Sequence, residues 1–160
     1  MGTKHHRLTH EAYKGRVCGS FTLCLQPRRS FFIHPKIVNV FTNFVAKVAA
    51  KHDFQAIYSF MPDHLNLIMF GNSDETDLLR AVGDFKQVSG YWFAKYHPGI
   101  RWQKSFYDRV LRAKEVHVLI AYVLENPVRR GLVDDWRKYR FTGAVGFDLE
   151  DFLSDHVNAG

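Results

Sequence analysis

The sequence predicts an α+β domain in which helices pack on a mainly antiparallel sheet. Segments with the alternating pattern of β-strands are interleaved with segments that repeat apolar residues at helical spacing, and the connections between them are short. The chain should form, in order, a strand, a helix, a hairpin, a helix, a strand and a helix. This order fits a ferredoxin-like arrangement. At 160 residues the chain suffices for one domain with a hydrophobic core.

Strands are expected where β-branched and aromatic residues form short runs. The clearest pair covers 55–60 and 65–70, joined as a hairpin across the turn sequence MPDH. The other strands are expected over 16–26 and 101–112.

Helices are expected where apolar residues recur with a period of 3.6 residues. The first covers 36–52, and the second covers 78–97 and ends at a Pro-Gly pair. The third covers 113–126, and Pro127 is expected to end it because proline lacks the backbone N–H that continues a helix.

The charge balance indicates a polyanionic partner. The chain has 22 Lys and Arg residues against 16 Asp and Glu, a net charge of +6. Such a basic surface is typical of nucleic-acid-binding proteins, although it can also serve solubility alone. The acidic residues gather near the C-terminal end, which suggests three parts: a basic N-terminal arm (1–16), a central domain (17–143) and an acidic C-terminal tail (144–160).

The sequence predicts a cytoplasmic protein without a membrane partner. No apolar run approaches the ~20 residues of a spanning helix, and the first residues are polar and basic rather than typical of a secretory signal. Cys18 and Cys24 are expected on one strand, ~20 Å apart if it is extended, which is too far for a disulfide.

The hairpin carries an unusual pair of polar residues. Because side chains alternate along a strand, His64 and Asn66 should share one face with Ile68, while Leu65 and Leu67 face the opposite way. An imidazole beside an amide in an apolar strand is either part of a reactive site or a solvated edge.

The third helix carries Tyr122 and Asn126, four residues apart and therefore on one side of it. A phenol attacks a phosphodiester poorly unless a cation polarises the phosphate. His64, Asn66 and Asn126 would offer that cation one imidazole and two amide oxygens, a set suited to Mg²⁺ or Mn²⁺. Taken singly, each residue also has an ordinary structural interpretation: a packed or surface histidine, a core tyrosine, a helix-ending asparagine.

Three motifs contain these residues: MPDHLNLIM, RWQKSFYDRVLR and YVLENPVRRGLV. In this order, after an N-terminal strand, they resemble the single-tyrosine HUH transposases of insertion sequences, and especially the REP-associated tyrosine transposases that act on repetitive extragenic palindromes. The resemblance covers about residues 17–139. It implies the fold of HUH nucleases, with Tyr122 as the nucleophile and His64 and Asn126 as metal ligands.

One position departs from the family pattern. The family strand reads Met-Pro-Asn-His-hydrophobic-His, and Asn66 stands where the second histidine is expected. An amide oxygen should bind Mg²⁺ or Mn²⁺ more weakly than this imidazole would. Either the site works with weaker metal binding, or the protein binds DNA without cleaving it.

The resemblance implies metal-dependent nicking and strand transfer on single-stranded DNA beside a hairpin, through a 5′-phosphotyrosine. The alternative is a non-catalytic protein that binds palindromic DNA. A plain RNA-binding domain is disfavoured because the aromatic signature of such sheets is absent. The oligomeric state, monomer or homodimer, is left open.

Basic and aromatic residues outside the metal set are expected to contact DNA. Trp102 and Tyr107 could stack on unpaired bases, although core packing is favoured for Trp102. The acidic tail could fold over the basic surface as a DNA mimic, although a solvated end helix is favoured. Arg109 and Arg112 both lie in the motif RWQKSFYDRVLR. At most one of them should face the site, because their positions do not fit the alternation of one strand face. The expected phosphate contacts are Arg129, Arg130, Arg109, Arg112, Arg7, Lys14 and Arg16.

Overall fold

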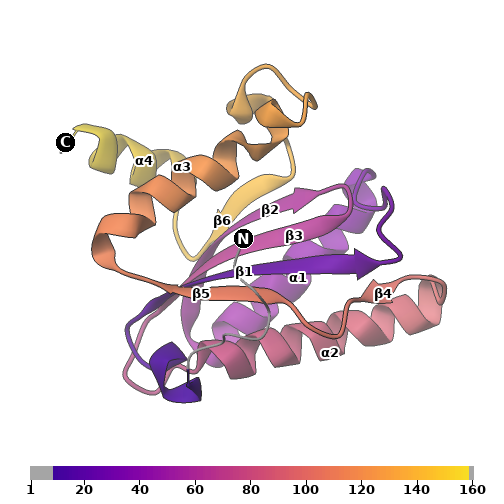
Figure 1. Ribbon diagram of the computed structural model, residues 1–160, viewed down its shortest axis with the longest axis horizontal. Coiled ribbons are helices and arrows are strands. Elements are labelled where there is room, and N and C mark those ends of the chain that lie inside the picture. Colours follow the sequence, from indigo (N-terminus) through magenta and orange to yellow (C-terminus); the bar gives the residue numbers. More distant parts are fainter. Residues whose placement is uncertain (1–8, 159–160) are drawn as a thin grey trace.

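A single antiparallel sheet lies between two layers of helices in the computed structural model, which describes residues 9–158 (Figure 1). Helices α1 (Pro35–His52) and α2 (Leu78–Tyr96) cover one face. Helices α3 (Ala113–Arg129) and α4 (Leu149–Asn158) lie on the other. None of the helices in the described range is long and apolar enough to cross a membrane.

The sheet has the strand order β4-β1-β3-β2-β6, and β5 also pairs with β1. All pairings are antiparallel, and β5 and β4 follow one another along the same side of β1. The strands are β1 (Cys18–Gln26), β2 (Phe54–Met61), β3 (His64–Gly71), β4 (Arg101–Trp102), β5 (Tyr107–Leu111) and β6 (Thr142–Val145), and two 3₁₀ segments are η1 (His10–Tyr13) and η2 (Trp136–Lys138).

The predicted fold class and order of elements are confirmed, with three differences. The strand expected over 101–112 is interrupted, so that β4 and β5 are separate. Helix α3 continues past Pro127 to Arg129. Pro127 is buried and lies in the last turn, where the missing backbone N–H costs the helix only one hydrogen bond near its end. The C-terminal part adds β6 and α4, and β6 spans the expected boundary at 143/144.

The hairpin places its residues on two faces as the alternation predicts. Leu65, Leu67 and Met69 are buried in the larger apolar cluster with α1 and α2. Ile68 belongs to the smaller cluster, which α3 completes with Ile120, Val123 and Leu124. His64 and Asn66 therefore lie on the face that α3 covers.

Trp102 is a core residue. It is 7% exposed, and its indole lies against the rings of Phe32 and Phe41. The indole Nε1–H donates to Ser89 Oγ at 2.8 Å. This excludes Trp102 as a platform for unpaired bases and confirms the structural interpretation.

Replacing Trp102 with phenylalanine should lower the free energy of unfolding by about 2–4 kcal/mol, because a buried hydrogen bond is lost and the smaller ring leaves a cavity. Urea denaturation measures this change, and Ser89→Ala should destabilise less, by about 1–2 kcal/mol, because it removes only the acceptor of the bond. DNA affinity measured below the unfolding transition should stay that of the wild type. A loss of DNA affinity in the folded Trp102→Phe protein would contradict the core assignment.

The C-terminal segment packs its apolar side chains inward. Phe147 and Phe152 contact the ring of Phe70 at the end of β3, with centroid separations of 6.3 and 6.5 Å. The acidic residues Glu150 and Asp151 lie exposed in the first turn of α4. The tail is thus an integral part of the α3 layer, and its apolar residues anchor it there.

Candidate active site

His64 begins β3 at the turn of the hairpin and is only 6% exposed. Its Nδ1 lies 2.7 Å from Asp63 Oδ1. Because an ionised carboxylate only accepts hydrogen bonds, Nδ1 carries the proton, and the lone pair of Nε2 is left available to bind a cation. A carboxylate in this position is the usual partner of a metal-binding histidine.

The electrostatics of this pair favour a neutral imidazole beside an ionised carboxylate. Burial lowers the pKa of His64, and the carboxylate of Asp63 opposes this only in part. Burial raises the pKa of Asp63, but hydrogen bonds from His64 and Arg28 outweigh it and hold that pKa below its ordinary value. Arg28 Nε donates to Asp63 Oδ2 at 3.0 Å. Neutral imidazole is the form that binds metal ions.

Asn66 belongs to a row of polar residues that crosses the sheet. Its Oδ1 accepts a hydrogen bond of 3.1 Å from Thr22 on β1, and on its other side β2 places Ser59 opposite it. Ser59 Oγ lies 3.1 Å from Thr142 Oγ1 on β6. The row ends on β5, where the half-buried Tyr107 stands opposite Thr22 of β1 in the strand register. The amide oxygen keeps a second lone pair for a cation.

Tyr122 lies on the outer side of α3 and is 60% exposed. The helix buries Ile120, Val123 and Leu124 against the sheet, and at about 100° per residue Tyr122 points away from that face. The guanidinium of Arg129 stacks over the tyrosine ring, 3.9 Å from its centroid, and donates to the Tyr122 carbonyl oxygen at 2.6 Å. The phenol is therefore accessible and held by a cation.

Asn126 lies one turn beyond Tyr122 and is half-buried, between the outer side of α3 and its buried face. His117, which the sequence places on another face, lines a hollow on the opposite flank of the helix, beside Trp136 and Leu153. The structure thus puts Tyr122 and Asn126 on one flank of α3, as their spacing predicts.

A hollow of about 520 Å³ separates the outer flank of α3 from β5. Arg109 enters it from β5 and is paired with Glu115 of α3. Arg112 also pairs with Glu115, at 3.3 Å, but is not part of the lining. Only one arginine of this motif therefore lies beside the tyrosine. The lining residues are Arg109, Lys114, Glu115, Val118, Leu119 and Tyr122.

The two arginines after the helix diverge. Arg129 covers the Tyr122 ring, whereas Arg130 lines a smaller hollow of about 190 Å³ with Asp63 and Pro62 at the hairpin turn. Arg130 is also close enough to lower the pKa of His64. Arg129 thus contacts Tyr122, and Arg130 lies near His64.

Lys14 and Arg16 are not brought to this site. Lys14 pairs with Glu11 at 2.9 Å and lies in a bridge with Asp77, and Arg16 pairs with Asp74 at 3.8 Å. Lys14 and Arg16 lie beside Gly71, at the opposite end of β3 from His64. Seven residues separate Gly71 from His64, which corresponds to ~23 Å along a strand. Arg7 lies outside the described residues.

The residues that fit a metal ion form a mixed set. Within residues 9–158 there is no group of three His, Cys, Asp or Glu side chains that could hold a metal. His64, oriented by Asp63, would supply one nitrogen, and Asn66 and Asn126 would supply amide oxygens. Such ligands suit Mg²⁺ or Mn²⁺ in an open site better than Zn²⁺ in a closed one.

Sequence reasoning missed the groups that surround His64. Cys24 is 4% exposed and stands opposite His64 in the β1–β3 register, where Arg28 Nη1 lies 3.4 Å from its Sγ. Neither cysteine forms a disulfide, as expected. Burial raises the pKa of the Cys18 thiol to about 12, which excludes it as a nucleophile at neutral pH. Only the register between distant strands reveals these neighbours.

Comparison with known proteins places the chain in a family. The family model described as IS200-like transposase matches residues 19–126. Comparison with curated proteins gives no match. The fold is similar to that of a REP-associated tyrosine transposase solved bound to a REP hairpin, with 21% sequence identity, a TM-score of 0.73, and coverage of 86% of this chain and 81% of that one. It is also similar to a protein from Deinococcus radiodurans described as a transposase, with 13% identity, a TM-score of 0.52, and coverage of 79% and 97%. Because the family model spans more than half of its length, the chain belongs to the IS200-like transposase family.

Proposed function

We propose that the protein nicks single-stranded DNA beside a hairpin and rejoins strands through a covalent tyrosine intermediate. The observation that carries this proposal is the placement of a carboxylate-oriented histidine, His64, on the sheet face covered by the helix that bears Tyr122 and Asn126. The hairpin as substrate is supported by the similar transposase, which was solved with a REP hairpin.

In this reaction the Tyr122 oxygen attacks the scissile phosphorus and its proton passes to water. A bond forms between the phenol oxygen and phosphorus, and the bond from phosphorus to the 3′-oxygen breaks. The products are a 5′-phosphotyrosine and a free 3′-hydroxyl, which takes up a proton. One phosphate ester replaces another, so no external energy source is needed. A 3′-hydroxyl can then attack the phosphotyrosine in the reverse direction and rejoin a strand.

The remaining residues position the phosphate. His64, Asn66 and Asn126 would hold Mg²⁺ or Mn²⁺, which supplies charge that polarises the phosphate. Arg109, in the hollow beside Tyr122, would contact a neighbouring phosphate.

Formation of a covalent adduct tests the proposal. Hairpin oligonucleotides with randomised single-stranded flanks, labelled at the 3′ end, should become linked to the protein in Mn²⁺ and not in EDTA. The label should map to the tryptic peptide 115–129, in which Tyr122 is the only tyrosine. If the pool gives no adduct at any Mn²⁺ concentration, the proposed nicking is wrong.

A second function, binding of palindromic DNA without cleavage, is favoured by Asn66 alone, which replaces a histidine and already bonds Thr22. This function predicts hairpin binding that weakens as salt rises and that does not change on removal of divalent metal.

A further inference from the structure

The positive charge of the protein comes from two segments of the sequence. Residues 26–52 and 85–107 contain nine of the 22 Lys and Arg residues and none of the 16 Asp and Glu residues. The remaining 110 residues therefore carry 13 basic residues against 16 acidic ones. The net charge of +6 thus arises entirely from these two segments.

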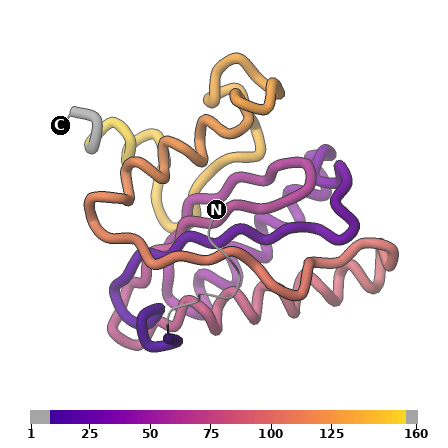
Figure 2. Tube along the Cα trace, viewed as in Figure 1, coloured from indigo at the N-terminus to yellow at the C-terminus, as the bar shows by residue number. Residues whose placement is uncertain are grey.

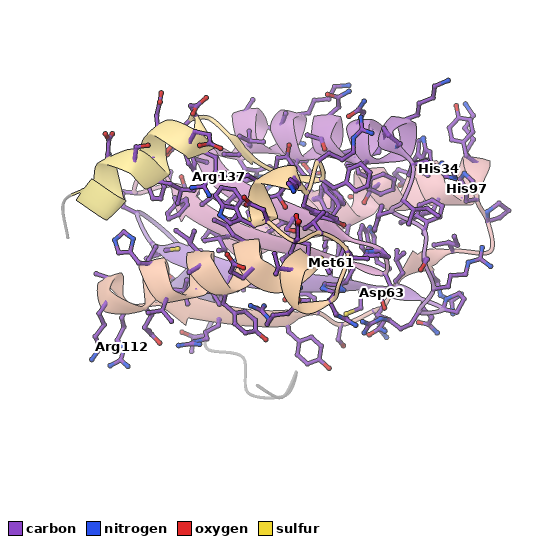
Figure 3. The ribbon with its side chains drawn as sticks, turned by 90° about the horizontal axis from the view of Figure 1, so that it is seen from above. His34, Met61, Asp63, His97, Arg112 and Arg137 are labelled. Carbon is purple, nitrogen blue, oxygen red and sulfur yellow. The ribbon has the colours of Figure 1, made fainter. Side chains whose placement is uncertain are left out.

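The two segments meet at one end of the molecule, where β1 leads into α1 and where α2 ends (Figure 2). Phe31 joins them, because its ring lies 5.7 Å from that of Phe93 and 5.1 Å from that of His97. His34 and His97 accordingly lie near each other at this end (Figure 3). Arg28, Arg29, Lys36, Lys95 and Arg101 belong to the parts of the two segments that meet here, whereas Lys47 and Lys51 lie in the last turns of α1.

Exposed aromatic and apolar side chains occupy the same end. Tyr96 is 56% exposed and Ile33 is 50% exposed. The Trp92 ring lies 5.5 Å from Tyr96 and 5.2 Å from His97, and Lys95 Nζ is 5.2 Å from the Tyr96 ring centroid. We call this set the aromatic–basic surface; it consists of Ile33, His34, Trp92, Lys95, Tyr96 and His97.

The cations around this surface are not neutralised by ion pairs. Within the part of the chain that the structure describes, no salt bridge involves Lys95, Arg29, Lys36 or Arg101. In contrast, Lys14 and Arg16 of the N-terminal part both pair with carboxylates. Only the former group presents its full charge to a partner.

The surface is continuous with the candidate active site. The backbone N–H groups of Phe31 and Phe32 donate to the Pro62 carbonyl at the hairpin turn, at 2.8 and 3.0 Å. Three residues earlier, Arg28 binds Asp63, the partner of His64. A strand leaving the His64 end of the sheet can therefore reach the aromatic–basic surface without crossing an acidic segment.

We propose that the aromatic–basic surface binds unpaired nucleotides of single-stranded DNA, as a second contact outside the nicking site. Stacking of bases on aromatic rings, combined with cations that follow the backbone, is the standard means of binding a single strand. A purely apolar partner would not account for cations without ion pairs, and a polyanion without bases would not account for the exposed rings. The identity of the strand as DNA rests on the proposed function.

Fluorescence anisotropy with a labelled oligo-dT of about 12 nucleotides, in EDTA, tests the proposal on the full chain. Tyr96→Ala should weaken binding about 5- to 100-fold, the range found for loss of one stacked base. Tyr96→Trp should restore it. Tyr91 provides the matched control, because it is 67% exposed on the same helix but five residues away, on a different face. Tyr91→Ala should bind like the wild type.

The charge component has its own measurement. Lys95→Ala should reduce the slope of log affinity against log salt by about 0.7 if it neutralises one phosphate of a single strand. Lys47→Ala, in the last turns of α1, should leave the slope unchanged.

The outcomes separate this proposal from the nicking proposal, because the binding assay contains no divalent metal. If oligo-dT binding depends on Tyr96 but the protein forms no adduct, the proposed aromatic–basic surface stands and the proposed nicking is wrong. Unchanged affinity in both Tyr96→Ala and Lys95→Ala would overturn the surface, whether or not adducts form. Heparin carries negative charge but no bases. If Tyr96→Ala lowers the affinity for heparin as much as the affinity for oligo-dT, the proposed stacking of bases on this surface is also wrong.

Discussion

Replacing Tyr122 with phenylalanine should abolish the covalent adduct, a loss of about 10³-fold or more, while hairpin binding persists. The substitution removes only the hydroxyl that would attack phosphorus, and loss of a nucleophile typically costs this much or more. Because the side chain is 60% exposed, the free energy of unfolding should stay within about 0.5 kcal/mol of the wild type.

Tyr91→Phe is the matched control, since it removes an equally exposed hydroxyl from another helix and should leave the adduct unchanged. An adduct that persists in Tyr122→Phe would contradict the assignment of the nucleophile. Because Tyr122 faces away from its own sheet, mixing Tyr122→Phe with His64→Ala chains is informative. Recovery of the adduct in the mixture would show that one chain supplies the tyrosine to the histidine of another.

The second large effect concerns the proposed metal ligands. Asp63→Asn should weaken Mn²⁺ binding about 10- to 100-fold, because the carboxylate that orients His64 and increases its basicity is lost. Asp63 stands where the family pattern has asparagine, so this carboxylate can offset the weaker ligand Asn66. Asn66→His should accordingly strengthen Mn²⁺ binding. Calorimetric titration with Mn²⁺ in the absence of DNA measures both changes.

Arg28→Gln separates the two roles of Asp63. It removes the ion pair with Asp63 and retains the hydrogen bond to His64, so Mn²⁺ affinity should change little. Equal Mn²⁺ affinity in Asp63→Asn and the wild type would show that the carboxylate only stabilises the turn. No gain from Asn66→His would remove residue 66 from the ligand set.

The fold could be predicted from the sequence because most of it rests on local patterns. Alternation put His64 and Asn66 on one face, and spacing put Tyr122 and Asn126 on one flank of α3. The predicted end of α3 at Pro127 was wrong, because burial of the proline ring depends on tertiary packing. Strand β6 was missed because its residues, Thr142–Val145, form an edge strand too short to show a period.

The surroundings of the site were less predictable because they depend on register. Nothing local to Cys24 or Thr22 indicates that β1 places them beside His64 and Asn66. Charge was equally misleading: Lys14 and Arg16 pair with the carboxylates of Glu11 and Asp74, away from the site. Counting charges along a chain does not show which of them are neutralised in the fold.

Glu115 has two roles, and DNA bound in the hollow as proposed would interrupt one of them. Its side chain accepts from the backbone N–H of Arg112 at 2.9 Å, which caps α3, and it also holds the guanidinium of Arg109. In the proposed reaction, a phosphate that binds Arg109 would replace this carboxylate and leave Glu115 with the cap alone. Glu115 would then compete with the substrate for Arg109, and DNA binding would include the cost of breaking this ion pair.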